Sequence, residues 1–188
     1  MNKLPVALAA LFLAARAFAT PETFNIEPAH TNLVFGYRQL GISGHMHLFD
    51  KTSGQIVVDC AAKTGSVDVS IDAKSVDSGY PLLDEYLEAE DFFDAAKYPT
   101  IVFKSMKVKF DCNHPGEIEG YLTVKGVTKP AYLTVTSFQA LPVQALNKDA
   151  IDAGAVAKFK RSEFNMGKYE PVVSDEVTLI IGMEAVKD

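Results

Sequence analysis

Residues 66–72 read SVDVSID, and this stretch decides the fold class. Its apolar residues, Val67, Val69 and Ile71, alternate with serine and aspartate. Successive side chains of a β-strand point to opposite faces, so this alternation predicts a strand with one buried face and one solvated face. Strands of this kind are typical of antiparallel sheets.

The same alternation recurs on both sides of this strand. It is present in residues 31–37, 118–124 and 177–183, where the apolar sets are Leu33, Phe35 and Tyr37; Ile118, Gly120, Leu122 and Val124; and Val177, Leu179, Ile181 and Met183. Residues 101–110 change phase, because Ile101 and Phe103 have one parity and Met106, Val108 and Phe110 have the other. A β-bulge near Ser105 would restore one apolar face. The alternative is that both faces are partly buried there.

Turn signals separate the alternating segments. Glycine, proline and small polar residues gather at residues 51–54, 62–65, 113–116 and 125–130. Short strands joined by such turns predict an all-β fold, either an antiparallel up-and-down β-barrel of about eight strands or a sandwich. Residues 142–154 are polar, and we expect a long loop there.

One segment interrupts the pattern. Residues 80–96 combine aromatic and acidic side chains, with Leu83 and Leu87 at helical spacing, and predict a short helical insert. Phe92 and Phe93 are adjacent and therefore point in different directions; we expect one in the core and one facing a cavity, and the alternative is that both are core. A closed sheet with an apolar lining and an aromatic lid is a container, which favours binding over catalysis.

The first 19 residues have the features of a signal peptide. Lys3 precedes an uncharged segment, residues 4–15, and Ala17-Phe18-Ala19 fits the small-x-small rule. A retained anchor is the alternative, but this segment is shorter than the roughly 20 residues of a spanning helix. We therefore expect cleavage after Ala19, export to the periplasm, and a single domain over residues 20–188.

The mature chain is acidic. Removing Lys3 and Arg16 from the 18 basic residues leaves 16 against 24 acidic ones, a net charge of −8. An acidic protein without a basic cluster is a poor candidate for nucleic acid or for an anionic membrane surface.

Cys60 and Cys112 each follow an aspartate at the end of an alternating segment. In an oxidising compartment an even number of cysteines favours a disulfide, and two free, half-buried thiols are the alternative. There is no CxxC spacing, which argues against a metal site. The two segments are expected to run in the same direction, which would leave both cysteines at one end of the sheet.

Five runs of sequence resemble the bacterial YceI-like family, also described as polyisoprenoid-binding proteins. In order, they are IEPAHT at 26–31, KTSG at 51–54, KTGSVDV at 63–69, DFFDAAKYP at 91–99 and LTVKGVTKP at 122–130. The resemblance extends from about Thr23 to Val186. It implies an extended lipocalin-like barrel whose long apolar interior holds isoprenoid, quinone-like or other amphiphilic lipids, in a family with many periplasmic members.

The chain departs from the family pattern at four places. Gln39 stands where relatives often have histidine, residues 45–48 read HMHL where relatives have glycine and a short strand, and Ala140 and Ala153 stand where many relatives have cysteine. These departures leave the polar contacts at the pocket mouth, and the identity of the ligand, open.

Alternation and the resemblance together give a set of candidate lipid-binding residues. They are Leu33, Phe35, Val69, Ile71, Leu83, Leu87, Phe92, Phe93, Phe103, Leu122, Arg161, Phe164 and Leu179. The guanidinium of Arg161 offers several donors to a phosphate or quinone oxygen. The favoured alternative is structural: Arg161 pairs with a carboxylate and packs against a strand end.

His45 and His47 lie two apart, so a strand would place both on one face, compatible with a shared metal. Further ligands would have to come from Asp50, His30 or His114. Two histidines that line the pocket mouth or face solvent are the favoured interpretation. We expect no metal and no cofactor.

The sequence predicts a periplasmic carrier for an amphiphilic lipid, an isoprenoid or isoprenoid quinone, with transient contacts to a membrane or membrane protein. It contains no G-x-S-x-G, H-E-x-x-H or P-loop motif, and the acidic residues at 84–94 are typical of a solvated helix face. A hydrolase or isomerase acting on such lipids is one alternative and requires an inward-facing His, Asp or Glu. A protein-interaction module with a packed barrel is another, and it predicts no extended cavity.

Overall fold

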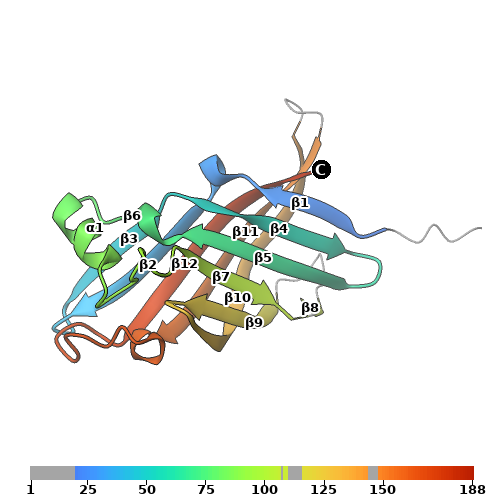
Figure 1. The fold of residues 1–188 in the computed structure, drawn as a ribbon. Helices are drawn as coiled ribbons and strands as arrows, with labels where there is room; N and C mark the ends of the chain where they lie inside the picture. The colour runs from blue at the N-terminus through green and yellow to red at the C-terminus, as the bar shows by residue number, and fades with distance from the viewer. Residues whose placement is uncertain (1–19, 107, 110–115, 144–147) are drawn as a thin grey trace, which may run out of the picture.

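The computed structural model describes residues 20–106, 108–109, 116–143 and 148–188. These residues form a closed antiparallel β-barrel with one short α-helix at one end (Figure 1). The strands are β1 (Glu22–Ile26), β2 (Asn32–Gln39), β3 (Ser43–Phe49), β4 (Thr52–Asp59), β5 (Thr64–Asp72), β6 (Val76–Asp77), β7 (Thr100–Ser105), β8 (Val108–Lys109), β9 (Glu117–Val124), β10 (Val127–Val143), β11 (Lys148–Lys160) and β12 (Glu176–Lys187). The helices are α1 (Pro81–Glu88) and the 3₁₀ turns η1 (Pro28–His30), η2 (Ala73–Ser75) and η3 (Arg161–Phe164).

The twelve described strands occupy eight positions around the barrel, each called here a stave. Four of the staves consist of two strands in succession. β1 continues into β2 through η1, β3 into β4 through residues 50–51, β5 into β6 through η2, and β7 is followed by β8. Each stave pairs with its neighbour in the chain, so that β1 pairs β4, β2 pairs β3, and the order continues through β5, β7, β9, β10, β11 and β12. The predicted up-and-down barrel of about eight strands is confirmed.

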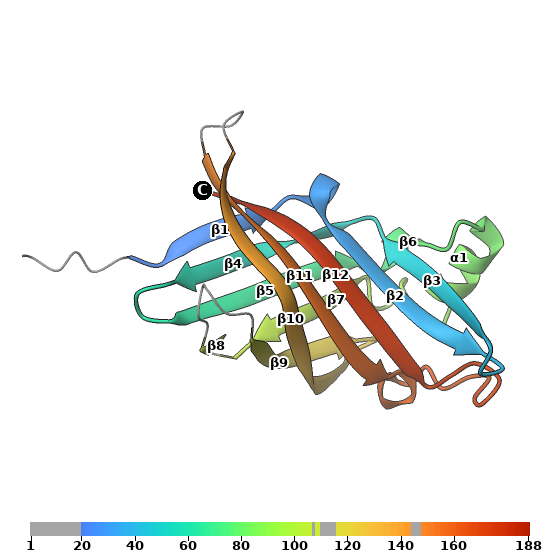
Figure 2. The same ribbon diagram turned by 180° about the vertical axis from the view of Figure 1, so that it is seen from behind.

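β12 closes the barrel by pairing with both halves of the first stave. Leu179 lies opposite Phe35 of β2, and Ala185 lies opposite Ile26 of β1. The long strands β10, β11 and β12 lie side by side with β2 across one wall (Figure 2). An up-and-down barrel closed in this way leaves the sheet almost no free edge.

The apolar faces predicted from alternation point inward. Val67, Val69 and Ile71 are buried on β5, where Val69 lies opposite Phe103 and Ile71 opposite Ile101 of β7. The core therefore lines the inside of the barrel rather than a layer between two sheets.

The predicted phase change is present between β7 and β8. Phe103 is 6% exposed and Val108 is 6% exposed, whereas Met106 between them is 44% exposed, so the inward parity resumes at Val108 and not at Met106. Gly120 of β9 lies opposite Ser105 beside this irregularity. A Cβ there would lie 2.5 Å from the carbonyl oxygen of Lys104 and 2.6 Å from Cζ of Phe103, so only glycine fits.

Two turn predictions are wrong. Residues 142–154 do not form a loop: β10 runs to Val143 and β11 begins at Lys148, opposite it. The exposed Lys148, Asp149 and Asp152 flank the deeply buried Ala150 and Ile151, so polarity alone gave a misleading signal. The strand break expected at 51–54 lies at residues 50–51, a bend between β3 and β4 and not a turn. Gly54 lies in β4, where a Cβ would lie 2.0 Å from the carbonyl oxygen of Asp68.

The predicted helical insert is shorter than the sequence suggested. α1 begins at Pro81, a favourable first position, and ends at Glu88, followed by turns through residue 97. The amides of Phe93 and Ala95 donate to the carbonyls of Leu87 and Glu88, which holds these turns against the end of the helix. α1 and the chain between η3 and β12 lie at the same end of the barrel (Figure 1). Among the described residues, no helix is both long enough and apolar enough to span a membrane.

Candidate functional site

Two cavities occupy the inside of the barrel. The first, called here the inner cavity, has a volume of about 110 Å³. The second, called here the lid cavity, has a volume of about 320 Å³ and lies under α1. We use "lid" for residues 81–96 and 165–175, which cover this end of the barrel.

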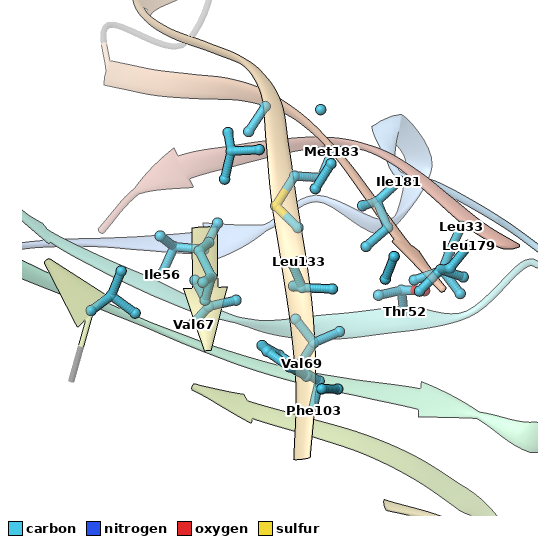
Figure 3. A pocket seen from close by; sticks show the side chains of 18 of the residues that line it. Leu33, Thr52, Ile56, Val67, Val69, Phe103, Leu133, Leu179, Ile181 and Met183 are labelled. Atoms are coloured by element: carbon cyan, nitrogen blue, oxygen red, sulfur yellow. The ribbon is translucent and has the colours of Figure 1, made fainter. Parts of the chain in front are cut away.

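The inner cavity is almost entirely apolar. Side chains from β2, β4, β5, β7, β10 and β12 point into it (Figure 3), among them Leu33, Ile56, Val67, Val69, Phe103, Leu133, Leu179, Ile181 and Met183. Thr52 is also in the lining; its hydroxyl is buried and has no hydrogen-bond partner in the part of the chain that the structure describes.

Small side chains on β11 leave room for the inner cavity. Its inward positions include Ala153, Ala155 and Ala157, between Ile151 and Phe159, and all five line the inner cavity. The small alanine side chains leave volume that larger residues would fill. This period-two pattern was readable in the sequence and was missed because alanine is a weak signal of alternation.

The two cavities meet. Five side chains line both of them: Leu33, Ile71, Leu122, Phe159 and Leu179. Along β12 the lining runs from Val177 in the lid cavity to Met183 in the inner cavity, about 20 Å at the rise of an extended strand. The barrel thus offers an elongated apolar space that is wider at the lid.

Charged side chains contribute little to this lining. Among the described residues, no Asp or Glu lines either cavity. Lys158 borders the inner cavity, but its ammonium lies 2.8 Å from the carboxylate of Glu176 and its side chain is 64% exposed. Arg161 is the other cation in the lining.

Arg161 holds the lid loop together. Its guanidinium donates to the carbonyl oxygens of Ser174, Lys168 and Val173 at 2.7–2.8 Å, and also to that of Met166. Arg161 is 4% exposed, and burial lowers its pKa. The structural role expected for Arg161 is present, but the predicted carboxylate partner is wrong, because four backbone carbonyls take its place. Asp175 instead accepts from Ser162.

The two halves of the lid are tied to each other and to the barrel. The phenol oxygens of Tyr86 and Tyr169 are hydrogen-bonded, and the ammonium of Lys168 donates to the carboxylate of Asp91. Lys125, in the turn between β9 and β10, donates to the carbonyl of Asn165 at 3.0 Å.

Phe92 and Phe93 both line the lid cavity, so the expected division into one core residue and one cavity residue is wrong. Phe93 packs edge-on against Phe35 and Phe49, with centroids 5.8 and 5.3 Å apart. Phe92 packs against Tyr86 at 5.3 Å. One ring therefore faces the barrel and the other faces the lid, with the cavity between them.

A polar cluster lies at the lid end on β2 and β3. The strand register places Tyr37 opposite His45 and Phe35 opposite His47, so all four side chains point inward. The rings of Tyr37 and His45 stack at 5.4 Å, and Nε2 of His47 lies 3.1 Å from the hydroxyl of Tyr37. Burial lowers the pKa of His47, with a smaller contribution from His45, and burial raises the pKa of Tyr37.

No group of three metal-ligating side chains is present in the described residues, and His114 lies outside them. His30 lies 3.3 Å from Glu184. His45 lines the lid cavity, as the mouth-lining interpretation expected.

Most of the candidate binding residues line these cavities. The inner cavity takes Leu33, Val69, Ile71, Phe103, Leu122 and Leu179, and the lid cavity takes Phe35, Leu83, Leu87, Phe92, Phe93 and Arg161. Phe164 does not belong to either lining: it is 1% exposed and packs edge-on against Phe159. The sequence analysis missed Tyr86, Phe159, Met166 and Tyr169 as cavity residues.

Cys112 lies outside the described residues, so its pairing with Cys60 stays a prediction. Cys60 is exposed in the turn after β4. β4 and β8 both pair antiparallel with β5 and so run in the same direction, as expected. Lys109, three residues before Cys112, lies opposite Thr64 at the start of β5. Lys109 of β8 therefore lies beside the hairpin that carries Cys60.

Comparison with known proteins gives a consistent family. A UPF0312 protein of Vibrio cholerae is 36% identical over 115 residues, and the matched region spans 61% of this chain and 61% of that relative. The solved YCEI protein of Campylobacter jejuni is 30% identical, with a TM-score of 0.68 over 80% of this chain and 90% of that one.

A solved domain from Saccharophagus degradans, described as a polyisoprenoid binding domain, shares the fold with a TM-score of 0.64 at 15% identity, over 88% of this chain and 98% of that one. The sequence model of the family described as the YceI-like domain matches residues 24–185. The chain belongs to the YceI-like family.

Proposed function

We propose that this protein is a carrier for an amphiphilic lipid with an isoprenoid tail, held along the two adjoining cavities. The observation that carries the proposal is the elongated interior, which is apolar from Val177 to Met183 and has no carboxylate in its described lining. The polyisoprenoid-binding description of the Saccharophagus domain supports the same class of ligand.

An apolar tail needs no specific polar contacts to bind in such a space. Each Å² of apolar surface removed from water contributes about 25 cal/mol, so affinity grows with the length of tail enclosed. A branched isoprenoid chain also fills a lining of mixed Leu, Val and Phe side chains better than a thin straight chain does.

The two alternatives predict different interiors. A packed interaction module predicts no extended cavity, whereas the barrel encloses volumes of about 110 and 320 Å³. An enzyme requires an inward acid or base, and His45 and His47 do point inward. Neither His is oriented by a carboxylate in the lining, and His47 is bonded to a phenol, so binding without turnover is the function that we propose.

We further propose that the protein works in the periplasm, after cleavage between Ala19 and Thr20, and that it exchanges lipid during transient contact with a membrane or membrane protein. The pattern Lys3, residues 4–15 and Ala17-Phe18-Ala19 supports export. Exposed apolar side chains at the lid end support the membrane contact: Leu40, Ile42, Leu82 and Val172 are 67%, 82%, 63% and 47% exposed.

The test is mass spectrometry of organic extracts from protein purified out of the periplasm of its native host. We expect an isoprenoid lipid, present close to one per chain and recovered chemically unchanged after incubation with the protein. Recovery of no lipid would refute the carrier, and conversion of the lipid during incubation would favour the enzyme. N-terminal sequencing of the same material should begin at Thr20.

A further inference from the structure

The inner and lid cavities differ in polarity. The lining of the inner cavity is apolar apart from a few hydroxyl side chains and Lys158 at its border, whereas the lid cavity includes Tyr37, Gln39 and His45. A lipid with a polar head would place its tail in the inner cavity and its head at the lid end. This orientation rests on the proposed function.

Two imidazole nitrogens at the lid end lack hydrogen bonds. Nε2 of His45 and Nδ1 of His47 are buried, and neither has a partner in the part of the chain that the structure describes. His47 as a whole is 5% exposed. A buried polar atom left unpaired is destabilising, so these atoms are poised to bond with a polar group of a ligand.

The orientation of the cluster is fixed before a ligand arrives. Tyr37 bonds to Nε2 of His47 and stacks on His45, and the β2–β3 register holds all three side chains on one face. When the phenol of Tyr37 donates to Nε2, the neutral imidazole carries its proton on Nδ1, a donor without an acceptor. A carbonyl or hydroxyl oxygen satisfies such a donor. When Nε2 donates to the phenol, Nδ1 is an acceptor without a donor, which a hydroxyl group can also satisfy.

The charges at this end do not suit a phosphate. Arg161 has four of the five N–H donors of a guanidinium committed to carbonyl oxygens, and Lys168 is paired with Asp91. Asp77 and Asp84 act on His47 electrostatically, and α1 adds Glu85 and Glu88. Burial also lowers the pKa of His47, which favours a neutral imidazole beside Tyr37. Tyr37 and His45 line the lid cavity itself, and His47 lies next to them, outside that lining.

We propose that Tyr37, His45 and His47 form a headgroup site that binds the carbonyl or hydroxyl oxygen of an uncharged isoprenoid lipid, such as a quinone or an alcohol, and discriminates against the phosphorylated form.

The experiment compares three probes with similar tails: geranylgeraniol, geranylgeranyl phosphate and the hydrocarbon phytane. Binding of each to the delipidated protein is measured by native mass spectrometry, since the chain has no tryptophan for intrinsic fluorescence. We expect the alcohol to bind about tenfold more tightly than the phosphate. His45→Leu and His47→Leu should each weaken binding of the alcohol three- to tenfold, the range of one hydrogen bond, and leave phytane binding within twofold.

Met46→Leu is the matched control. Met46 lies on the same strand, between the two histidines, but faces outward and is 54% exposed. The Met46→Leu protein should bind all three probes as the wild-type protein does. Circular dichroism checks that each variant folds, and a His47→Gln variant, which keeps a donor and an acceptor, replaces His47→Leu if that protein is unfolded.

The outcomes separate the two proposals. If no probe binds, the carrier function itself fails. If phytane and the alcohol bind equally, or the phosphate binds best, or the histidine variants bind the alcohol as the wild-type protein does, the headgroup site is wrong and the carrier function stands.

Discussion

The phenol of Tyr86 on α1 is hydrogen-bonded to the phenol of Tyr169 in the loop between η3 and β12. This bond joins two segments that are far apart in the chain and together cover the lid cavity. The pair of Lys168 with Asp91 and the stacked rings of Phe92 and Tyr169 also join the two halves of the lid. We expect a ligand to leave through this end of the barrel, which would require such contacts to break.

We therefore predict that Tyr86→Phe speeds the release of bound lipid. Loss of one exposed hydrogen bond should raise the release rate a few-fold, with little effect on thermal stability. Transfer of a fluorescent isoprenoid from the protein to acceptor vesicles measures the rate. Tyr80→Phe is the control, because Tyr80 is 59% exposed at the start of the same helix. Equal rates for Tyr86→Phe and the wild-type protein would show that this bond does not gate the cavity.

Phe103→Asp should abolish lipid binding. Phe103 is 6% exposed, lines the inner cavity and packs beside Gly120, so the substitution places a carboxylate in an apolar space where ionisation is costly. Phe103→Ala tests packing alone and should lower the free energy of unfolding by about 3–5 kcal/mol.

Lipid content by mass spectrometry and urea unfolding measure the two effects. Tyr121→Asp is the matched control, since Tyr121 lies on the adjacent strand β9 but is 47% exposed. A folded Phe103→Asp protein with lipid at wild-type occupancy would show that Phe103 does not line the binding space.

Stability should fall as the pH drops below about 6.5, the ordinary pKa of histidine. Burial holds the pKa of folded His47 below that of the unfolded chain, so the unfolded state binds a proton first. His47 makes its full contribution to the free energy of unfolding above its pKa in the unfolded chain. That contribution is lost as the pH falls through its pKa in the folded protein.

Chemical unfolding at pH 7.5 and at pH 5.0 measures the difference in the free energy of unfolding between the two pH values. His47→Gln should lose less stability than the wild-type protein over this interval, and Met46→Leu should lose as much as the wild-type protein. If His47→Gln loses as much stability as the wild-type protein between pH 7.5 and pH 5.0, His47 does not change its protonation on unfolding.

The oxidised protein should contain a Cys60–Cys112 disulfide. β4 and β8 run in the same direction, and the pairing of Lys109 with Thr64 places Lys109, three residues before Cys112 in the sequence, beside the hairpin of Cys60. The disulfide would close a loop of about 50 residues, which stabilises the fold by about 4 kcal/mol in the chain-entropy model. Thiol labelling of the unreduced, denatured protein should find no reactive thiol, and the Cys60→Ser variant should expose one. Two reactive thiols per wild-type chain would contradict the pairing.

The exposed apolar side chains at the lid end should mediate membrane contact; this group, called here the apolar patch, comprises Leu40, Ile42, Leu82 and Val172. The amide of Leu40 donates to the carbonyl of Val172 at 2.7 Å, so the exposed residues of the β2–β3 turn and the lid loop are neighbours. Replacing Ile42 and Leu82 with serine should lower sedimentation with phosphatidylcholine vesicles about tenfold. Tyr132→Ser, at an exposed site on β10, is the control.

Adding anionic phosphatidylglycerol should not strengthen this binding, because α1 carries Asp84, Glu85 and Glu88 beside the patch. Vesicle binding that survives the double substitution, or that depends on anionic lipid, would place the contact elsewhere on the molecule.

The sequence by itself determined the inward faces of the strands in which apolar and polar residues alternate clearly. Alternation along β5, β9 and β12 identified Val69, Leu122 and Leu179 as inward, because period two is a local property of an extended chain with one buried side. The same rule located the phase change after Ser105. Polar composition misled between residues 142 and 154, where the end of β10 and the start of β11 resemble a loop.

The tertiary structure decided how the lid closes and what the polar residues do. Arg161 bonds with carbonyls of residues 166–174, and Tyr86 meets Tyr169, through contacts that depend on how distant segments fold over the barrel end. His45 and His47 gained their partner, Tyr37, only from the register of β2 against β3. Local alternation predicts the face of the sheet on which a side chain lies. Hydrogen bonds are directional and short-ranged, so the partners of a polar side chain are fixed only when the barrel closes.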